Sequence, residues 1–276
     1  MRNFEGKVAV ITGGASGIGR GAARALAREG AHIAVADLHA ERMAETVAEL
    51  EALGVRAISV ACDVGRVEDI GNLRSRTLDH FGRVDILMNN AGVLPVGQFE
   101  NTPLAEWEHV LRVNFLSVVA GVQAFLPDLA ANGEGHVVNT ASLAATFAYD
   151  PFTLAYNASK AAVLSLSEGL ALALKPKGVS VTCLVPGPVM TNIGEQIRPQ
   201  GPLGELGAYA SANFAIRTPD DVGALVVEAI RSKRFFLPTN ENVFDVLRSR
   251  AENPERFLAE IQAFLAPSLP AGKAAS

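Results

Sequence analysis

The chain has 276 residues, of which 49% are apolar and 19% are charged, and its formal net charge is −5. This composition is typical of a globular protein with a large interior, in one large α/β domain or two small ones. The negative charge gives no electrostatic case for binding nucleic acid or an anionic membrane surface. The amino-terminal residues lack the apolar core of a signal peptide, and the apolar runs are too short to span a membrane. We therefore expect a cytoplasmic protein without a membrane partner.

Cysteine and histidine usage excludes further classes of protein. Cys62 and Cys183 lie within apolar segments and predict buried thiols in a reducing compartment, without a disulfide. The five histidines are scattered singly and no cysteine pair is closely spaced, so we predict no metal site. We assign none of the histidines a catalytic role.

Short apolar runs alternate with amphipathic stretches along most of the chain. The runs predict strands at 8–12, 32–36, 57–61, 86–89, 136–140 and 180–185, and a last short one at 234–237. The amphipathic stretches predict helices at 20–29, 40–53, 67–81, 155–174 and 220–231, and one long helix within 104–129. This alternation indicates an α/β fold, a Rossmann-like doubly wound parallel sheet with helices on both faces, in a single domain of residues 1–265.

Three segments fall outside the regular pattern. Residues 188–217 contain glycine, proline and scattered apolar residues, and a connection of this length predicts a lid over a substrate site. Residues 238–265 predict a C-terminal extension of one or two amphipathic helices, which either caps the pocket or joins subunits. Residues 266–276 predict a flexible tail.

A glycine-rich turn lies directly between the first strand and the first helix. Glycines at this place let the backbone turn sharply and approach a diphosphate, which rests on the amino terminus of the helix. We therefore predict that Gly13, Ser16, Gly17, Ile18 and Gly19 bind a dinucleotide.

The end of the second strand carries a carboxylate. Asp37 lies roughly 20 residues beyond the glycine turn, where an acidic side chain accepts hydrogen bonds from the adenosine ribose and repels a 2′-phosphate. Leu38 and Ser16 are not basic, and we interpret His39 and Arg42 as solvated helix residues. The sequence therefore favours NAD over NADP.

The end of the third strand suits an adenine contact. Asp63 offers a carboxylate for the amino group of the base, and Val64 offers an apolar wall. The alternative for Asp63 is a loop residue that caps the following helix.

A tyrosine and a lysine are spaced four residues apart in the alanine-rich helix at 155–174. At this spacing the side chains of Tyr156 and Lys160 lie on one face of the helix, one turn apart. A phenol has a pKa of about 10, and a nearby ammonium lowers it. Such a pair can transfer protons near neutral pH.

Together these residues resemble the short-chain dehydrogenases/reductases, in the short single-domain branch of that family. The resemblance covers about residues 7–237. The matching motifs, in family order, are Thr12-Gly13-x-x-x-Gly17-x-Gly19, Asp63, Asn89-Asn90-Ala91-Gly92, Asn114, Ser142, Tyr156-x-x-x-Lys160 and Pro186-Gly187-x-x-x-Thr191.

The resemblance implies catalytic roles for four residues. Tyr156 would be the general acid/base, and Lys160 would lower its pKa and bind the nicotinamide ribose. Ser142 would hydrogen-bond the substrate oxygen. Asn114 would hold a water that links Lys160 to solvent.

The resemblance also implies further residues that contact the cofactor, and it implies a homo-oligomer. The adenosine end would be contacted by Asn90, Ala91 and Gly92, and the nicotinamide by Pro186, Gly187, Val189 and Thr191. A homodimer or homotetramer would form through the long helices that follow residues 101 and 155.

Candidate substrate contacts lie near the catalytic residues in the sequence. They are Leu94, Pro95, Leu143, Ala144, Phe147, Phe152, Met190 and Ile193. No lysine or arginine is among them, although Arg198 and Arg217 in the predicted lid could swing in. The pattern favours a neutral, bulky secondary alcohol or its ketone as substrate. The layout of lid and tail is similar to that of family members that oxidise benzylic alcohols of lignin-derived aryl ethers.

Two alternatives stay open. An NADPH-dependent ketoreductase of acyl or polyketide type predicts a basic residue near Asp37 or Ser16, and we find such a residue absent. A non-catalytic NAD-binding protein of the same fold would be expected to lack Tyr156, Lys160 or Ser142, and all three are in the sequence.

Overall fold

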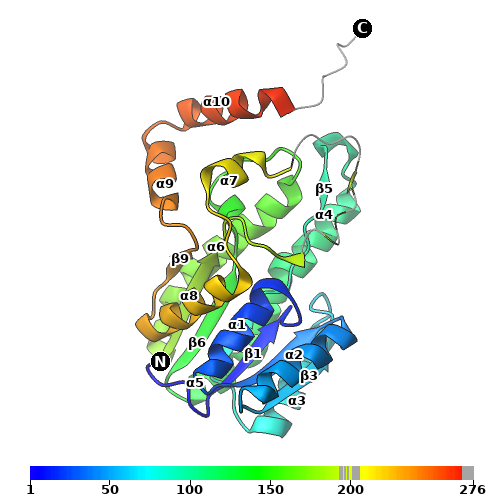
Figure 1. The fold of residues 1–276 in the computed structure, drawn as a ribbon, viewed down its shortest axis with the longest axis vertical. Helices are drawn as coiled ribbons and strands as arrows, with labels where there is room; N and C mark the ends of the chain where they lie inside the picture. The colour runs from blue at the N-terminus through cyan, green and yellow to red at the C-terminus, as the bar shows by residue number, and fades with distance from the viewer. Residues whose placement is uncertain (193–194, 196, 198, 201–205, 269–276) are drawn as a thin grey trace.

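A computed structural model of the chain describes residues 1–192, 195, 197, 199–200 and 206–268. Seven strands form one sheet in the order β3-β2-β1-β4-β6-β7-β9, and all neighbouring pairs are parallel (Figure 1). The strands are β1 (Val8–Thr12), β2 (His32–Asp37), β3 (Ala57–Ala61), β4 (Ile86–Asn89), β6 (Gly135–Thr140), β7 (Val179–Val185) and β9 (Phe236–Pro238). The predicted single-domain parallel sheet is confirmed.

Helices cover both faces of the sheet. One face is covered by α1 (Gly17–Arg28), α2 (Ala40–Ala52) and α8 (Pro219–Ser232), and the other by α3 (Val67–Phe81), α5 (Ser117–Ala131) and α6 (Leu154–Leu174). The first core contains Leu26 and Val226, and the second contains Leu73 and Phe125, all of them fully buried. The central strand β1 is buried along its whole length, which explains its continuous apolar sequence.

The order of the strands fixes where a ligand can bind. The chain runs outward from β1 to β3 and then returns to β4 on the other side of β1, so the direction of winding reverses between β1 and β4. In open parallel sheets, the crevice at the carboxyl ends of the strands at such a reversal is the usual ligand site.

The predicted long helix within 104–129 is interrupted. It consists of α4 (Leu104–Leu111), a π-helical turn (Arg112–Leu116) and α5. By length and composition alone, the stretch Leu104–Ala131 would pass as a membrane span, which the prediction of short apolar runs did not foresee. Of its most apolar window, 44% is buried within the protein.

Several short elements were not predicted. A two-stranded parallel sheet pairs β5 (Val96–Gly97) with β8 (Pro199–Gln200), and thereby joins the segment after β4 to the predicted lid. The lid also contains the helix α7 (Ala208–Asn213). Elements of two to six residues are too short to show an apolar periodicity in the sequence. Contacts with residues distant in the chain stabilise them.

The C-terminal extension forms two helices, α9 (Val243–Glu252) and α10 (Pro254–Leu265). In Figure 1 they extend beyond α7, on the side of the molecule away from the body of the sheet. The buried face of α10 carries Phe257 and Ile261, which join Phe214 beside α7 in a separate apolar cluster. The predicted tail lies outside the described residues beyond Ser268.

Candidate active site

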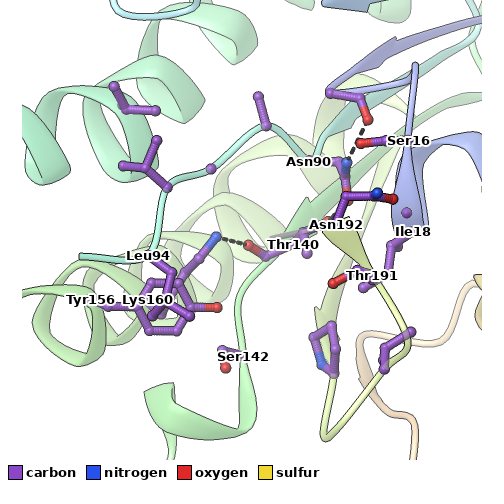
Figure 2. Close-up of a pocket in the computed structure, with 18 of the residues that line it drawn as sticks. Ser16, Ile18, Asn90, Leu94, Thr140, Ser142, Tyr156, Lys160, Thr191 and Asn192 are labelled. Atoms are coloured by element: carbon purple, nitrogen blue, oxygen red, sulfur yellow. Dashed lines mark hydrogen bonds between the residues drawn. The ribbon is translucent and has the colours of Figure 1, made fainter. Parts of the chain in front are cut away.

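A cavity of about 590 Å³ opens at the carboxyl ends of the central strands, at the reversal of the winding. Figure 2 shows Tyr156, Lys160 and Ser142 gathered at one end of it, and Ser16, Ile18 and Asn192 at the other. All predicted catalytic and cofactor-binding residues except Gly19 and Asn114 line this cavity. These are Gly13, Ser16, Gly17, Ile18, Asp37, Leu38, Asp63, Val64, Asn90, Ala91, Gly92, Ser142, Tyr156, Lys160, Pro186, Gly187, Val189 and Thr191.

The glycine turn is built by backbone contacts that exclude side chains. Gly13 has a φ of +62°, and a Cβ atom there would lie 2.9 Å from the Cα atom of Ala91. A Cβ atom on Gly19 would lie 2.2 Å from the carbonyl oxygen of Gly13. Gly19 therefore shapes the turn from behind and does not line the cavity, contrary to the prediction of a direct contact.

Asn90 stabilises this turn from the neighbouring strand. Its Nδ2 donates to the carbonyl oxygens of Thr12, at 3.1 Å, and Gly13, at 3.2 Å. Its backbone N–H donates to Thr12 Oγ1 at 2.9 Å. The side chain of Asn90 thus fixes the position of the turn, in addition to lining the cavity.

The amino terminus of α1 lines the cavity through Ser16, Gly17 and Ile18. Ser16 is the N-cap, makes no side-chain capping bond, and no acidic residue occupies the first turn. The exposed N–H groups and the helix dipole together favour an anion at this place.

Asp37 is held rigidly at the end of β2. Its carboxylate accepts hydrogen bonds from the backbone N–H groups of Leu38, at 2.7 Å, Ala15, at 3.2 Å, and His39, at 3.2 Å. The contact with Ala15 joins the acidic residue directly to the glycine turn.

His39 and Arg42 also line the cavity, next to Asp37. Their interpretation as solvated helix residues was therefore incomplete. Arg42 Nη2 lies 2.7 Å from Glu195 Oε2, and this ion pair links α2 to a residue of the predicted lid.

Asp63 does not cap the following helix α3, whose N-cap is Arg66, and its position at the cavity is compatible with the predicted adenine contact. Its Oδ1 accepts a hydrogen bond from the backbone N–H of Gly65 at 2.9 Å, as a loop residue would. Both Asp63 and Val64 line the cavity, as an adenine contact would require.

Tyr156 and Lys160 lie one turn apart at the start of α6, as predicted. Lys160 is buried, and its Nζ donates to the carbonyl oxygen of Thr140 at 2.8 Å (Figure 2). Burial lowers the pKa of Lys160 to about 8.

Burial also changes the expected pKa of the Tyr156 phenol. It raises the pKa of Tyr156, while hydrogen bonding with Ser142 opposes that rise. The predicted lowering by Lys160 does not dominate, because the ammonium is bound to Thr140 and lies 5.7 Å from the centre of the Tyr156 ring.

Asn114 does not line the cavity. It lies fully buried in the π-helical turn, where its Oδ1 accepts from Val93 N at 2.8 Å and its Nδ2 donates to Val93 O at 2.9 Å and Ser159 Oγ at 3.0 Å. Because these bonds use its side chain, Asn114 fastens the loop after β4 to α6. Its role toward a water molecule stays a prediction.

Most of the predicted substrate contacts are wrong. Of the candidates that the structure describes, only Leu94 and Ala144 line the cavity. Leu143 and Phe147 are buried in the apolar cluster with α10, Pro95 and Phe152 line a small separate depression, and Met190 is 61% exposed. Arg217 Nε donates to the carbonyl oxygen of Thr239 at 3.2 Å, so it does not reach into the cavity. Ile193 and Arg198 lie outside the described residues.

The substrate end of the cavity is more polar than predicted. Tyr149, Asp150 and Thr153 follow Ser142 in the chain and line this end, and His109 lines it from α4. The Asp150 carboxylate is buried and accepts hydrogen bonds from Phe152 N at 2.9 Å and Gly207 N at 2.8 Å. Tyr149, Asp150 and Thr153 belong to no motif, but their closeness to Ser142 in the sequence could have indicated that they line the cavity.

Metal binding and thiol chemistry find no support in the described part of the chain. No group of three or more His, Cys, Asp or Glu side chains is placed there to hold a metal ion. Cys62 and Cys183 are buried and unpaired, and burial raises the pKa of each thiol to about 12.

Comparison with known proteins agrees with this geometry. The profile of the short chain dehydrogenase family matches residues 7–201. The 1-deoxy-11-beta-hydroxypentalenate dehydrogenase of Streptomyces exfoliatus is 34% identical over 261 residues, which cover 93% of this chain and 91% of the relative.

Two solved structures have the same fold. The short chain dehydrogenase/reductase from Burkholderia phymatum in complex with NAD is 34% identical, with a TM-score of 0.82 over 93% of this chain and 96% of that one. The short chain dehydrogenase from Burkholderia cenocepacia in complex with NADP is also 34% identical, with a TM-score of 0.77 over 88% of this chain and 99% of that one.

Proposed function

This chain belongs to the short-chain dehydrogenase/reductase family of oxidoreductases, which bind a nicotinamide cofactor and act on CH–OH groups, and we propose that it is an NAD-dependent secondary-alcohol dehydrogenase. Its substrate would be a neutral, bulky or aromatic secondary alcohol or the corresponding ketone. The observation that carries this proposal is the meeting of Tyr156, Lys160 and Ser142 at one end of a cavity whose other end is the glycine turn.

The cofactor end fits a dinucleotide. A Cβ atom on Gly13 would contact the backbone of Ala91, so the turn has no side chain at this position. The amino terminus of α1, which has no side-chain cap, offers its N–H groups to a diphosphate. Asp37 would hold the adenosine ribose, and Pro186, Gly187 and Thr191 would lie along the nicotinamide end. When bound, the nicotinamide accepts or supplies the hydride.

The residues of the chain itself would handle the proton. Tyr156 would remove the proton of the alcohol or return it to the ketone oxygen, and Ser142 would hydrogen-bond the same oxygen. Lys160, whose ammonium is bound to Thr140, would stabilise negative charge on the phenol. These three side chains come from the loop after β6 and from α6, so the sheet and one helix orient them.

The charges at the substrate end support a neutral substrate. Among the described residues of the cavity wall, the only lysine and arginine side chains are Lys160 and Arg42, and Arg42 lies at the cofactor end. The buried carboxylate of Asp150 would repel an acidic substrate.

The experiment is a screen of aliphatic, benzylic and steroid-like secondary alcohols for NAD reduction, with Tyr156→Phe as the decisive variant. We expect the variant to bind NAD as the wild type does and to lose about 10²- to 10⁴-fold in turnover, the usual range for loss of a general acid/base. A variant that keeps nearly the full rate would show that another group transfers the proton.

NADP-dependent reduction is a second candidate, because His39 and Arg42 line the cavity beside Asp37. A basic side chain there can accommodate a 2′-phosphate. The ratio of kcat/KM for NAD and NADP separates the two candidates. If Asp37 sets the preference for NAD, Asp37→Ala should lower this ratio at least about tenfold, since one desolvated charge–charge contact is worth that much. An unchanged ratio would overturn the assignment to Asp37.

We also propose a cytoplasmic homodimer or homotetramer. Apolar side chains stay exposed on the helices of one side, namely Leu104 at 72%, Leu116 at 53% and Leu172 at 79%. Large apolar side chains left exposed on these helices favour association. Sedimentation of the purified chain would test the assembly.

A further inference from the structure

An acidic residue of the predicted lid binds two side chains of the cavity wall. Glu195 Oε2 lies 2.7 Å from Arg42 Nη2 of α2, and Glu195 Oε1 accepts a hydrogen bond from Asn192 Nδ2. Both Arg42 and Asn192 line the cavity, and Figure 2 shows Asn192 at the same end as Ser16. Glu195 therefore joins α2 to the segment after β7 at the cofactor end.

Arg42 stands where a cation would select the phosphorylated cofactor. It lines the cavity together with Asp37 and His39. The carboxylate at the end of β2 is placed to hold the adenosine ribose, and NADP carries its extra phosphate on a hydroxyl of that ribose. An arginine close to this carboxylate can accommodate the phosphate. What Arg42 binds in the protein therefore bears on the choice between NAD and NADP.

The charge of Arg42 is already balanced by Glu195. Their contact of 2.7 Å has the length of a charge-assisted hydrogen bond, about 2.7–2.9 Å. A phosphate that approached Arg42 would meet the carboxylate of Glu195 as well as that of Asp37, and like charges repel. A ribose hydroxyl carries no charge and meets no such repulsion. The ion pair thus disfavours NADP without opposing NAD.

The partner of Arg42 comes from a distant part of the chain. Glu45 lies on α2 almost one turn beyond Arg42, but its Oε2 is 3.5 Å from Nη1 of Arg20 on α1. Glu195 follows Arg42 by 153 residues. The side chains of the pair are 36% and 50% exposed, and a pair with this exposure contributes little to folding stability. A variant that breaks the pair should therefore stay folded.

We propose, on the basis of the proposed function, that Glu195 is a specificity-determining residue for the cofactor. Its carboxylate occupies the guanidinium of Arg42 and so withholds it from the 2′-phosphate of NADP. Asp37 repels that phosphate directly, and Glu195 neutralises the cation that would offset the repulsion. The predicted lid thereby takes part in the choice of cofactor, in addition to any contact with the substrate.

The test is calorimetric binding of adenosine 2′,5′-bisphosphate and adenosine 5′-monophosphate to the full chain and to Glu195→Gln. Glutamine keeps the shape of the side chain and an acceptor oxygen for Arg42, and removes only the charge. We expect the bisphosphate to bind about fivefold more tightly to the variant, as for one charge at a solvent-exposed position. Binding of the monophosphate should stay within about 1.5-fold. An unchanged bisphosphate affinity would overturn the inference.

Arg42→Ala shows whether the gain passes through the guanidinium. In the wild type, this change should weaken bisphosphate binding by less than about twofold, because Glu195 already balances the charge. In the Glu195→Gln background, the same change should remove the whole gain of about fivefold, since the two residues are coupled. If Arg42→Ala weakened binding equally in both backgrounds, Arg42 would already serve the phosphate and the inference would be wrong.

Glu45→Gln is the matched control, because it removes the same charge from α2 and leaves the partner of Arg42 in place. It should change bisphosphate affinity by less than about 1.5-fold. An equal gain in Glu45→Gln and Glu195→Gln would trace the effect to net charge and contradict a role of the ion pair. These titrations need no turnover. If the wild type oxidises no alcohol, the proposed function fails, while bisphosphate binding still decides the role of Glu195.

Discussion

The two ends of the cavity differ in whether backbone or side chains form the wall. At the cofactor end, the wall is mostly backbone: Gly13 and Gly19 approach neighbouring chain so closely that no side chain fits, and Asp37 is held by three backbone N–H groups. At the substrate end, the wall is mostly side chains from the loop after β6, and rings from α7 and α10 hold that loop.

This difference determines how each end can change. A backbone wall has few acceptable substitutions, because each extra atom meets a main-chain atom that cannot move away. A side-chain wall can be altered one residue at a time, and helices attached outside the cavity can alter it further. The first design suits a cofactor shared by a whole family, and the second suits substrates that differ among its members.

The largest expected effect is at the cofactor end. Gly13→Ala would place a Cβ atom 2.9 Å from the Cα atom of Ala91, at a φ of +62°. The overpacking and the left-handed backbone together should cost about 2–4 kcal/mol, so we expect NAD binding at least about thirtyfold weaker, measured by calorimetry.

Gly6→Ala is the matched control for this change. Gly6 has a φ of +67°, but a Cβ atom there would meet nothing within 4 Å. It should lose about 1 kcal/mol of folding stability and bind NAD as the wild type does. If both variants lost NAD affinity equally, backbone strain would determine cofactor binding, rather than the absence of a side chain at Gly13.

A smaller effect is expected from the aromatic support of the substrate end. Phe257→Ala removes a buried ring that contacts Phe147 and should lower the free energy of unfolding by about 3–5 kcal/mol in urea titration. Below its unfolding transition, the variant should show reduced kcat/KM for the alcohol with an NAD dissociation constant within about twofold of the wild type.

The neighbouring Leu258→Ala provides the comparison, because Leu258 is on the same helix and 52% exposed. It should change stability by no more than about 0.5 kcal/mol. If Phe257→Ala weakened NAD binding as strongly as it weakened alcohol turnover, the two ends of the cavity would not be separate units.

The same difference explains what could be predicted from the sequence. Strands buried on both faces have continuous apolar sequences, and a turn that excludes Cβ atoms requires glycine. The sheet and the positions of Gly13 and Asp37 could therefore be predicted from short stretches of the sequence. The π-helical turn around Asn114 was not, because it leaves no periodic signal and depends on contacts with Val93 and Ser159.

The substrate end could not be predicted because its geometry depends on residues distant in the chain. Leu143 and Phe147 were chosen as apolar neighbours of Ser142, yet Phe257 and Ile261, more than a hundred residues later, draw them into a separate core. That packing leaves Tyr149 facing the cavity.

Lys160 lies beside Tyr156 at the substrate end of the cavity, and its charge should appear in the stability of the free protein. Burial lowers its pKa in the folded chain to about 8, from an ordinary value of about 10.5 in the unfolded chain. Between these two values the unfolded state holds a proton that the folded state has released. The free energy of unfolding should therefore rise with pH in this window, by at most about 1.4 kcal/mol per pH unit.

Urea unfolding of the wild type and of Lys160→Met at pH 8 and pH 9.5 measures this smallest effect. Tyrosine ionisation is largely avoided below about pH 10 and is common to both proteins. The stability of the wild type relative to Lys160→Met should rise by about 1–2 kcal/mol over the interval. Lys177→Met, at an exposed position, should show no such rise relative to the wild type. A flat difference for Lys160→Met would mean that the bond to Thr140 keeps the ammonium charged despite its burial, and that the substrate end of the cavity carries a permanent positive charge.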